Sequence, residues 1–426
     1  MLTRFLVVVF TFSFVPSLVA QEIIPSTIDD RQEVSSADWP WWRGPYRNGT
    51  AYPDQDPPQT WSETENVVWK TAVPGRGHSS PIVVGNSVYL ATADRERDLQ
   101  SVLAYDRTTG KLQWEEVIHR GGLMKKNKKA SQASSSLAWD GERLFVSFPN
   151  RDQIFTTALD ENGKQLWQTK ISDYIIHQGY AASPNVYQHL VIINADNKGG
   201  GYIVALERET GKEVWRHARP KLPNYPSPVI LHAFGKDQMI MIGGKLVTSL
   251  NPLTGERNWE IDGSTEECVT STVTDGIHVY SSGGWPDNHV AAIKADGSGE
   301  VVWQNRSRVY VPSMLMIDGY LHAVLDAGVA TCWKSDTGQQ MWKSRLGGNF
   351  SSSPVRVGDL IYAANEEGET YIYKASSRRF TLVAKNKLGD NVFATPAIVG
   401  GQIFTRVAKD EDGKRNEYLY CLGHSN

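Results

Sequence analysis

The chain has 426 residues, a formal net charge of −3, 14 Trp, 37 Gly and 20 Pro. The nearly balanced charge excludes a sequence-wide basic field of the kind that binds nucleic acid or anionic lipid. Many Gly and Pro residues indicate many turns, and many Trp residues supply large apolar anchors. The composition therefore favours an all-β protein built from short strands.

Residues 1–20 have the pattern of an export signal. Arg4 gives the start a positive charge, residues 5–15 are apolar, and Ala20 places a small residue before a cut at Gln21. The apolar run is too short to cross a bilayer, and no later segment is long and apolar enough to do so. We expect a periplasmic or secreted protein without a transmembrane segment.

Two short segments precede the main domain. Residues 21–38 are polar and are expected to form a flexible linker. Residues 39–64 open with the aromatic motif WPWWRGPYRNG. We expect them to form a strap packed on the rim of the following domain, in preference to a binding motif. That domain is expected to extend over residues 65–426.

A tryptophan recurs along this domain at intervals of 39 to 53 residues. A turn rich in Asp, Asn and Gly comes shortly before most of these residues, such as DRTTG at 106–110 before Trp114. The turn is expected to join two strands, the second of which carries the tryptophan. The repeated residues are Trp69, Trp114, Trp167, Trp215, Trp259, Trp303 and Trp342.

A Ser or Thr opens the apolar run that follows each tryptophan strand, and eight such positions occur: Ser80, Ser136, Ser183, Ser227, Ser271, Ser313, Ser353 and Thr395. In the first unit the strand-like runs are 81–84, 87–92, 101–105 and 111–117. Four strands in each unit of about 40 to 45 residues is the pattern of a β-propeller. We predict an all-β, eight-bladed propeller of four-stranded antiparallel blades, with the hydroxyl strand innermost and the Trp strand outermost.

The two ends of the chain complete one blade. The last hydroxyl strand, at 395–399, is followed by runs at 402–408 and 417–422, and then no outer strand remains. Val67–Val73 is an outer strand with no inner strands before it. The N-terminal strand is therefore predicted to pair in the last blade and close the ring.

At this point the sequence resembles a family. The pattern S-P-x4-(G/N)-x2-(Y/F), followed by D-x2-T-G-K-x2-W, fits Ser80 through Trp114. It is similar to pyrroloquinoline-quinone (PQQ) repeats with tryptophan-docking motifs, and the resemblance covers residues 65–422. The motifs at 39–49 and 75–81 (GRGHSSP) also resemble secreted planctomycete-type propellers, and such proteins are similar to BamB-type outer-membrane assembly factors. The resemblance implies an eight-bladed propeller.

The resemblance includes two functional branches. Quinoprotein dehydrogenases of this family bind PQQ and calcium on the propeller axis, with an Asp base and a disulfide between adjacent Cys residues. Assembly factors bind no cofactor and act through protein contacts. Here Cys268, Cys332 and Cys421 are far apart and are expected to be small apolar core residues. We therefore expect no metal and no cofactor, and PQQ with calcium is disfavoured.

Several oxygen-bearing residues on loops are candidate calcium ligands. Each is expected instead to be a solvated loop residue. They are Asn194, Asp196, Glu266, Glu267, Asp287, Asp326 and Glu366.

The loops that enter the innermost strands share one face with those joining the second and third strands. Aromatic and polar residues on this face predict a funnel for a ligand or peptide. The candidates are Arg76, His78, His177, Tyr180, Tyr225, Glu267, Tyr310 and Phe393. For His78 and Tyr225 the alternative is that they only complete inner-strand packing.

A basic loop lies in the longest connection, between Trp114 and Ser136, and contains Lys125, Lys126, Lys128 and Lys129. It could bind an acidic partner or polyanion, or be a solvated loop. Residues 409–415 (KDEDGKR) are expected to be plain surface loop.

The function predicted is that of an exported, monomeric, non-enzymatic scaffold that binds a protein or peptide partner in the cell envelope. Two alternatives stay open: a PQQ-dependent oxidoreductase, and a propeller that binds extracellular glycan. A nucleic-acid partner is not expected.

Overall fold

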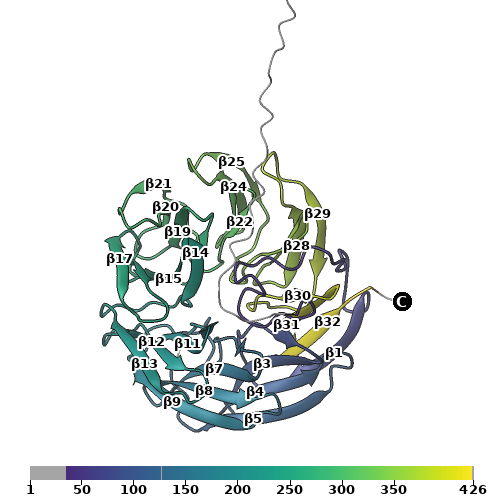
Figure 1. Ribbon diagram of the computed structural model, residues 1–426. Coiled ribbons are helices and arrows are strands. Elements are labelled where there is room, and N and C mark those ends of the chain that lie inside the picture. Colours follow the sequence, from purple (N-terminus) through teal and green to yellow (C-terminus); the bar gives the residue numbers. More distant parts are fainter. Residues whose placement is uncertain (1–34, 126, 425–426) are drawn as a thin grey trace, which may run out of the picture.

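The computed structural model describes residues 35–125 and 127–424, so the predicted signal, most of the predicted linker and Lys126 lie outside the described residues. The described chain forms eight four-stranded antiparallel sheets, and these are arranged as blades around a common axis (Figure 1). The predicted all-β, eight-bladed propeller is confirmed. No helix that could span a membrane occurs in the part of the chain that the structure describes.

Each of the first seven blades is a simple meander, and its strands run in chain order from the axis outward. Blades 1 to 4 consist of β2 (Ile82–Val84), β3 (Ser87–Asp94), β4 (Leu99–Asp106), β5 (Leu112–Arg120); β6 (Ala138–Trp139), β7 (Arg143–Asn150), β8 (Gln153–Asp160), β9 (Gln165–Asp173); β10 (Asn185–Tyr187), β11 (Leu190–Asn194), β12 (Tyr202–Glu207), β13 (Glu213–Ala218); β14 (Val229–Ala233), β15 (Lys236–Gly243), β16 (Leu246–Leu250) and β17 (Arg257–Asp262). Blades 5 to 7 consist of β18 (Val273–Thr274), β19 (His278–Gly283), β20 (His289–Lys294), β21 (Val301–Asn305); β22 (Leu315–Ile317), β23 (Tyr320–Leu325), β24 (Val329–Lys334), β25 (Gln340–Arg345); β26 (Val355–Val357), β27 (Leu360–Ala364), β28 (Glu369–Lys374) and β29 (Leu382–Lys387).

Blade 8 joins the two ends of the chain. Its strand order is β30 (Ala397–Val399), β31 (Gln402–Glu411), β32 (Lys414–Leu422) and β1 (Val67–Val73). The antiparallel register places Trp69 opposite Cys421 and Val73 opposite Glu417. The predicted closure of the ring by the N-terminal strand is therefore confirmed, with the predicted bounds of that strand.

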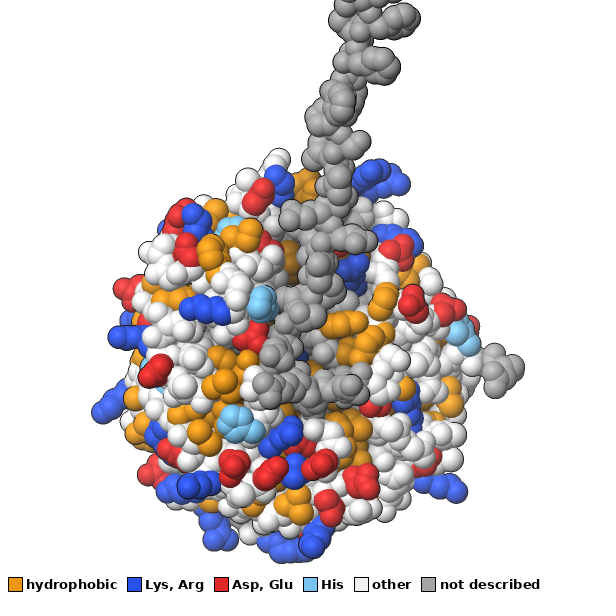
Figure 2. Space-filling view, viewed as in Figure 1, with side chains coloured by type: hydrophobic (Ala, Val, Ile, Leu, Met, Phe, Trp, Pro, Cys, Tyr) orange, Lys and Arg blue, Asp and Glu red, His pale blue; other side chains and the backbone are white. Residues whose placement is uncertain are grey.

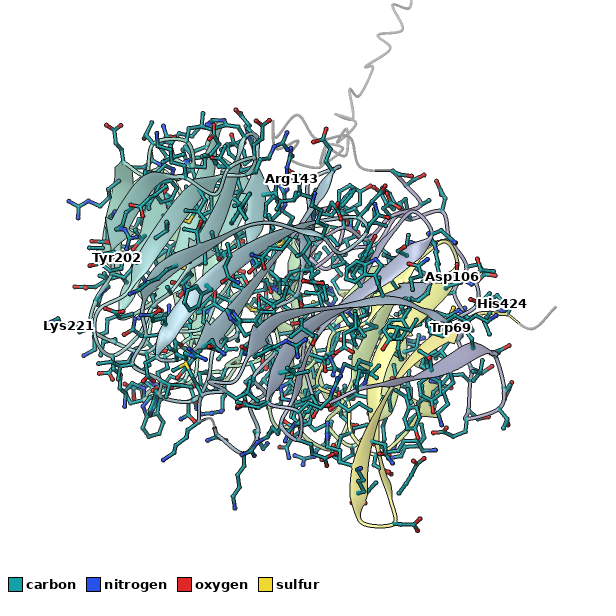
Figure 3. All side chains as sticks on the ribbon, turned by 90° about the horizontal axis from the view of Figure 1, so that it is seen from below. Trp69, Asp106, Arg143, Tyr202, Lys221 and His424 are labelled. Carbon is teal, nitrogen blue, oxygen red and sulfur yellow. The ribbon has the colours of Figure 1, made fainter. Side chains whose placement is uncertain are left out.

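One loop prediction is wrong. Residues 409–415 belong mostly to the β31–β32 hairpin, which turns at Asp412 and Gly413 and is the yellow hairpin projecting at the lower edge of Figure 3. Both turn residues have positive φ, 55° and 74°. An Asp-Gly pair favours such a two-residue turn. The sequence therefore contained the signal for a hairpin, although the charged residues around it resemble a surface loop. Two of the charges form ion pairs: Lys409 lies 3.1 Å from Glu63, and Arg415 lies 3.0 Å from Glu417.

Six of the seven docking tryptophans donate their indole N–H to a carbonyl in the turn of the next blade, whereas Trp259 donates to Gln238 of its own blade. The Trp69 indole N–H donates to the Arg107 carbonyl (2.8 Å), and a Cβ at Gly110 would lie 2.5 Å from the Trp69 ring. Gly110 also has a φ of +68°, so glycine is required there twice over. Figure 3 shows Trp69 on the same side of the molecule as Asp106, the first residue of that turn. Trp69 thus fastens the end of the ring to its beginning.

The N-terminal strap, residues 39–64, crosses the inner strands first and reaches the rim, where it was expected, only at its end: the Trp61 N–H donates to Asn386 of β29, the outer strand of blade 7 (3.1 Å). The Trp39 N–H donates to the Val83 carbonyl of β2 (2.7 Å), and the Ala51 N–H donates to the Arg356 carbonyl of β26 (2.8 Å). Trp39 and Trp61 are buried in one core cluster with residues of blades 1, 7 and 8. The strap therefore covers one end of the axis, which we call the lower face. The opposite, upper face carries the loops that enter each innermost strand.

Candidate binding site on the propeller axis

The Ser and Thr residues that open the innermost strands are linked around the axis. The N–H of Ser80 donates to Ser136 Oγ (2.9 Å), and the N–H of Thr395 donates to Ser80 Oγ (3.0 Å). The same bond, 2.8–2.9 Å long, runs from Ser136 to Ser183, Ser183 to Ser227, Ser271 to Ser313, Ser313 to Ser353 and Ser353 to Thr395. We call the eight residues the hydroxyl ring. It explains why the repeat keeps a hydroxyl at this position.

The strap enters the hydroxyl ring at the junction between blades 4 and 5. The bonds found among the described residues include no link from the Ser227 N–H to Ser271. The Trp42 indole N–H instead donates to Ser271 Oγ (3.0 Å). Trp42 therefore replaces the Ser227 N–H as the donor to Ser271, and it lines a cavity on the axis from the strap side.

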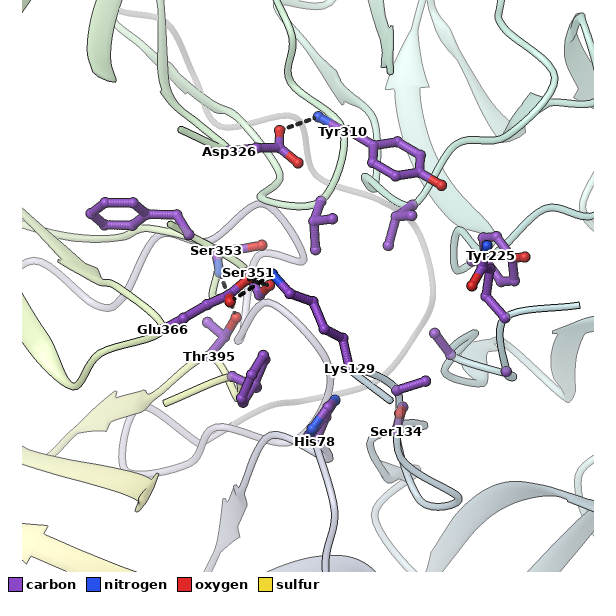
Figure 4. A pocket seen from close by; sticks show the side chains of 18 of the residues that line it. His78, Lys129, Ser134, Tyr225, Tyr310, Asp326, Ser351, Ser353, Glu366 and Thr395 are labelled. Atoms are coloured by element: carbon purple, nitrogen blue, oxygen red, sulfur yellow. Dashed lines mark hydrogen bonds and ion pairs between the residues drawn. The ribbon is translucent and has the colours of Figure 1, made fainter. Parts of the chain in front are cut away.

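A cavity of about 570 Å³ lies on the axis, within the size range of ligand pockets. Trp42 and six members of the hydroxyl ring line it, together with loops of the upper face. Because the strap lies below, the cavity is a blind channel that opens on the upper face. Figure 4 shows the loop side chains that surround it.

Five of the eight predicted funnel residues line this channel: His78, Tyr180, Tyr225, Tyr310 and Phe393. The His78 ring stacks on the Phe393 ring, with centroids 4.5 Å apart and an interplanar angle of 11°. The two residues come from the loops that enter blades 1 and 8, so ring closure brings them together. Tyr180 is mostly buried and donates from its hydroxyl to the Asn194 carbonyl (3.0 Å). It serves packing more than ligand contact.

His177 and Glu267 lie behind the channel wall and hold two of the tyrosines. His177 Nδ1 is 3.2 Å from the Tyr225 hydroxyl and 3.2 Å from Glu267 Oε1. The Tyr310 hydroxyl donates to Glu267 Oε2 (3.1 Å). Burial, and then the Glu267 charge, raise the pKa of both Tyr225 and Tyr310. This hydrogen-bonded group fixes the positions of the two rings at the channel mouth.

Arg76 does not line the channel. Its backbone pairs with Ala93, and its guanidinium donates to the Lys128 carbonyl (3.2 Å). Burial, followed by the positive charge of Arg415, lowers its pKa. Its role in the structure is to hold the basic loop against blade 1.

Among the described lysines of the basic loop, Lys129 alone reaches the channel. Lys129 Nζ lies 2.9 Å from Glu366 Oε2, and Glu366 also accepts a hydrogen bond from Ser351 (2.7 Å), as Figure 4 shows. The loop entering blade 2 is thereby tied to blade 7 across the channel mouth. Lys125 and Lys128 are exposed and point elsewhere than the lining, and Lys126 lies outside the described residues.

Several lining residues were not predicted to form the funnel. The sequence places Trp42 in the strap, and it indicates Asp326 and Glu366 only as candidate calcium ligands. Asp326 accepts the Tyr310 N–H (2.8 Å), and burial raises its pKa. Arg308 lies 5.0 Å from the centre of the Tyr310 ring. Asp326 and Glu366 are carboxylates in loops that join the second and third strands of a blade. This position was the sequence signal that could have placed them at the channel.

Three of the loop residues expected to be solvated are in fact buried: Asn194, Asp196 and Glu267. Asp196 forms a buried ion pair with Arg219 (3.2 Å) and accepts a hydrogen bond from Asn224 (3.0 Å). Their polar atoms therefore satisfy one another inside the blades. Within the described ranges, no three His, Cys, Asp or Glu residues are grouped to hold a metal ion. The three cysteines are free and fully buried, which confirms them as core residues.

Eight blades, tryptophans docked on the next blade's turn and the hydroxyl ring define a PQQ-like β-propeller. The sequence profile described as outer membrane protein assembly factor BamB matches residues 28–174, 100–344 and 286–382. The chain therefore belongs to the BamB family.

Sequence relatives and solved structures agree with this assignment. The chain is 24% identical to the BamB of Burkholderia pseudomallei (strain K96243) over 366 residues, which are 81% of this chain and 86% of the relative. It is 24% identical to the BamB of Yersinia pestis, over 78% and 84% of the two chains.

Among solved structures, BamB from Moraxella catarrhalis superposes with a TM-score of 0.58 at 11% identity, covering 83% of this chain and 99% of that one. A europium-containing methanol dehydrogenase superposes with a TM-score of 0.65 at 11% identity, covering 92% and 99%. At these identities the solved structures show the shared fold alone.

Proposed function

We propose that this protein is an exported, non-enzymatic scaffold that binds a protein or peptide partner of the cell envelope on its upper face. The observation that carries the proposal is the rigid aromatic surface around the channel mouth. The Tyr310 hydroxyl donates to Glu267, the Tyr225 hydroxyl is bonded to His177, and His78 is stacked on Phe393. Pre-ordered aromatic side chains are the usual anchors of protein interfaces.

An exposed tryptophan extends this surface outward. Trp285 is 54% exposed, and its backbone pairs with that of Glu267 directly beside the channel mouth. Ile175, in the loop entering blade 3, is 58% exposed. Large exposed apolar side chains provide contact area for a partner, and the polar groups beside them orient it.

The family supports an envelope partner, because its relatives carry the name of outer membrane protein assembly factors. The formal net charge of −3 gives no support to a nucleic-acid partner, and charged side chains of both signs are interspersed on the strap side of the propeller, which Figure 2 shows. A quinone-dependent oxidoreductase is the weaker candidate: the three buried thiols are separate, and the two lining carboxylates are bonded within the protein.

The test compares two exposed aromatic residues on opposite faces of neighbouring blades. Trp285→Ala removes the aromatic surface of the upper face, and Phe234→Ala removes a 49% exposed ring from the lower face. Mature wild type and both variants are immobilised and exposed to envelope extract of the source organism. We expect Trp285→Ala, but not Phe234→Ala, to lose the captured partner. Equal capture by both variants would contradict binding at the upper face.

A further inference from the structure

The hydroxyl ring has donors that the protein does not use. Each of its hydroxyl oxygens accepts a hydrogen bond from a backbone N–H or from the Trp42 indole. None of the eight hydroxyls donates its own proton in any bond found among the described residues. Each therefore keeps one O–H donor and one lone pair for a ligand or for water. Six of them line the channel: Ser80, Ser136, Ser183, Ser227, Ser353 and Thr395.

Aromatic surfaces accompany these hydroxyls at several levels of the channel. Trp42 lies at the lower end, the stacked His78 and Phe393 rings form part of the wall, and Tyr225 and Tyr310 stand at the mouth. Aromatic faces pack well against the C–H groups of a ligand, while hydroxyls orient its polar groups. A ligand that matches both has many hydroxyls on a partly apolar ring.

The charges that line the channel are already balanced. Lys129 pairs with Glu366 (2.9 Å), and Arg308 donates to the Gly284 carbonyl (2.7 Å). Asp326 accepts the Tyr310 N–H (2.8 Å). With two cationic and two acidic side chains, each bonded within the protein, the lining offers no excess charge to a strongly ionic ligand. An uncharged ligand fits this lining better than an anion does.

We propose that the blind channel binds an uncharged saccharide of one to three units, held by the hydroxyl ring and packed on the channel aromatics. The saccharide site shares the mouth aromatics with the protein-binding surface proposed above, but Trp42 and the hydroxyl ring below them belong to the saccharide site alone, and Trp285 belongs to the protein-binding surface alone. The two proposals can therefore fail separately.

The test uses the full mature chain and a blocking substitution. Ala181 lines the channel two residues before Ser183 and is partly exposed, so Ala181→Phe should fill the channel without breaking a bond, and Ala181→Ser is the matched control. The probes are glucose, N-acetylglucosamine and their β-1,4-linked trimers, measured by calorimetric titration and by ligand-observed NMR. We expect wild type and Ala181→Ser to bind at least one probe, and Ala181→Phe to bind it at least tenfold more weakly.

A hydroxyl variant gives a second readout. Ser183→Ala removes one free O–H, together with the acceptor of the Ser136 N–H, and the lost O–H should weaken the same saccharide about fivefold, the effect of one neutral hydrogen bond. Thermal unfolding and partner capture show whether each variant is folded. The proposal is overturned if no probe binds wild type, if Ala181→Phe binds saccharide as well as Ala181→Ser, or if inorganic phosphate or citrate binds the channel in preference to every saccharide.

Discussion

The closure of the ring by the N-terminal strand predicts that Trp69 is as important as any tryptophan inside the ring. Trp69 is 8% exposed, packs at 6.0 Å from the Phe404 ring of blade 8, and bonds to the Arg107 carbonyl of blade 1. Trp69→Ala removes this contact between the first and last blades. Trp342 is a matched comparison between blades 6 and 7, because it is 9% exposed and its indole donates to the Ser376 carbonyl at the same 2.8 Å.

The expected magnitude follows from burial. Truncating a buried tryptophan to alanine costs about 3–5 kcal/mol. Losing only the indole hydrogen bond, as in Trp69→Phe, costs about 1 kcal/mol. Trp69→Ala and Trp342→Ala should therefore destabilise the protein by similar amounts, and Trp69→Phe by much less.

Guanidinium unfolding followed by circular dichroism measures these free energies, and amide hydrogen exchange in β1 and β32 reports local opening. The reasoning predicts faster exchange of β1 and β32 in Trp69→Ala and of β25 in Trp342→Ala. It is refuted if Trp69→Ala unfolds within about 1 kcal/mol of wild type while Trp342→Ala loses the full amount. That result would mean that the N-terminal strand adds little to the closed ring.

Three further predictions concern buried polar groups. Burial lowers the pKa of His322 to about 4, below its unfolded value of about 6.5. The stability that the neutral ring contributes is therefore complete above about pH 6.5 and is lost as the pH falls toward 4. Between about pH 7.5 and 4.5, the free energy of unfolding should fall less steeply for His322→Gln than for wild type. Glu417→Leu leaves the buried Arg406 without its carboxylate and should cost about 3–5 kcal/mol in chemical unfolding, whereas a loss below 1 kcal/mol would argue against a buried pair. Trp42→Phe deletes the hydrogen bond to Ser271 and should lower the free energy of unfolding by about 1 kcal/mol. An unchanged unfolding midpoint would show that this hydrogen bond does not stabilise the hydroxyl ring.

The fold was predictable from the sequence because two independent periods agree. The tryptophan period predicts an outer strand, and the hydroxyl period predicts an inner strand. Counting both left Val67–Val73 without a blade of its own, which required closure in blade 8. The β31–β32 hairpin was missed because Asp412 and Gly413 stand in a charged stretch that resembles a surface loop.

The channel was only partly predictable because its composition depends on ring closure and on the strap. His78 and Phe393 were both predicted on the upper face, but more than 300 residues of sequence separate them, and only closure stacks them. Trp42 reaches the axis because the strap crosses the lower face, which aromatic content alone does not indicate. Glu267 and His177 were placed on the right face, but their role is to hold tyrosines, not to line the cavity.

The central claim is that the upper face of this propeller binds a protein of the cell envelope. A photo-crosslinking amino acid placed at Trp285 on the upper face, and in a separate chain at Phe234 on the lower face, tests it directly in intact cells of the source organism. We predict a discrete cross-linked protein from position 285 that is absent from position 234. Cross-links confined to position 234, or none at position 285, would contradict the proposed function.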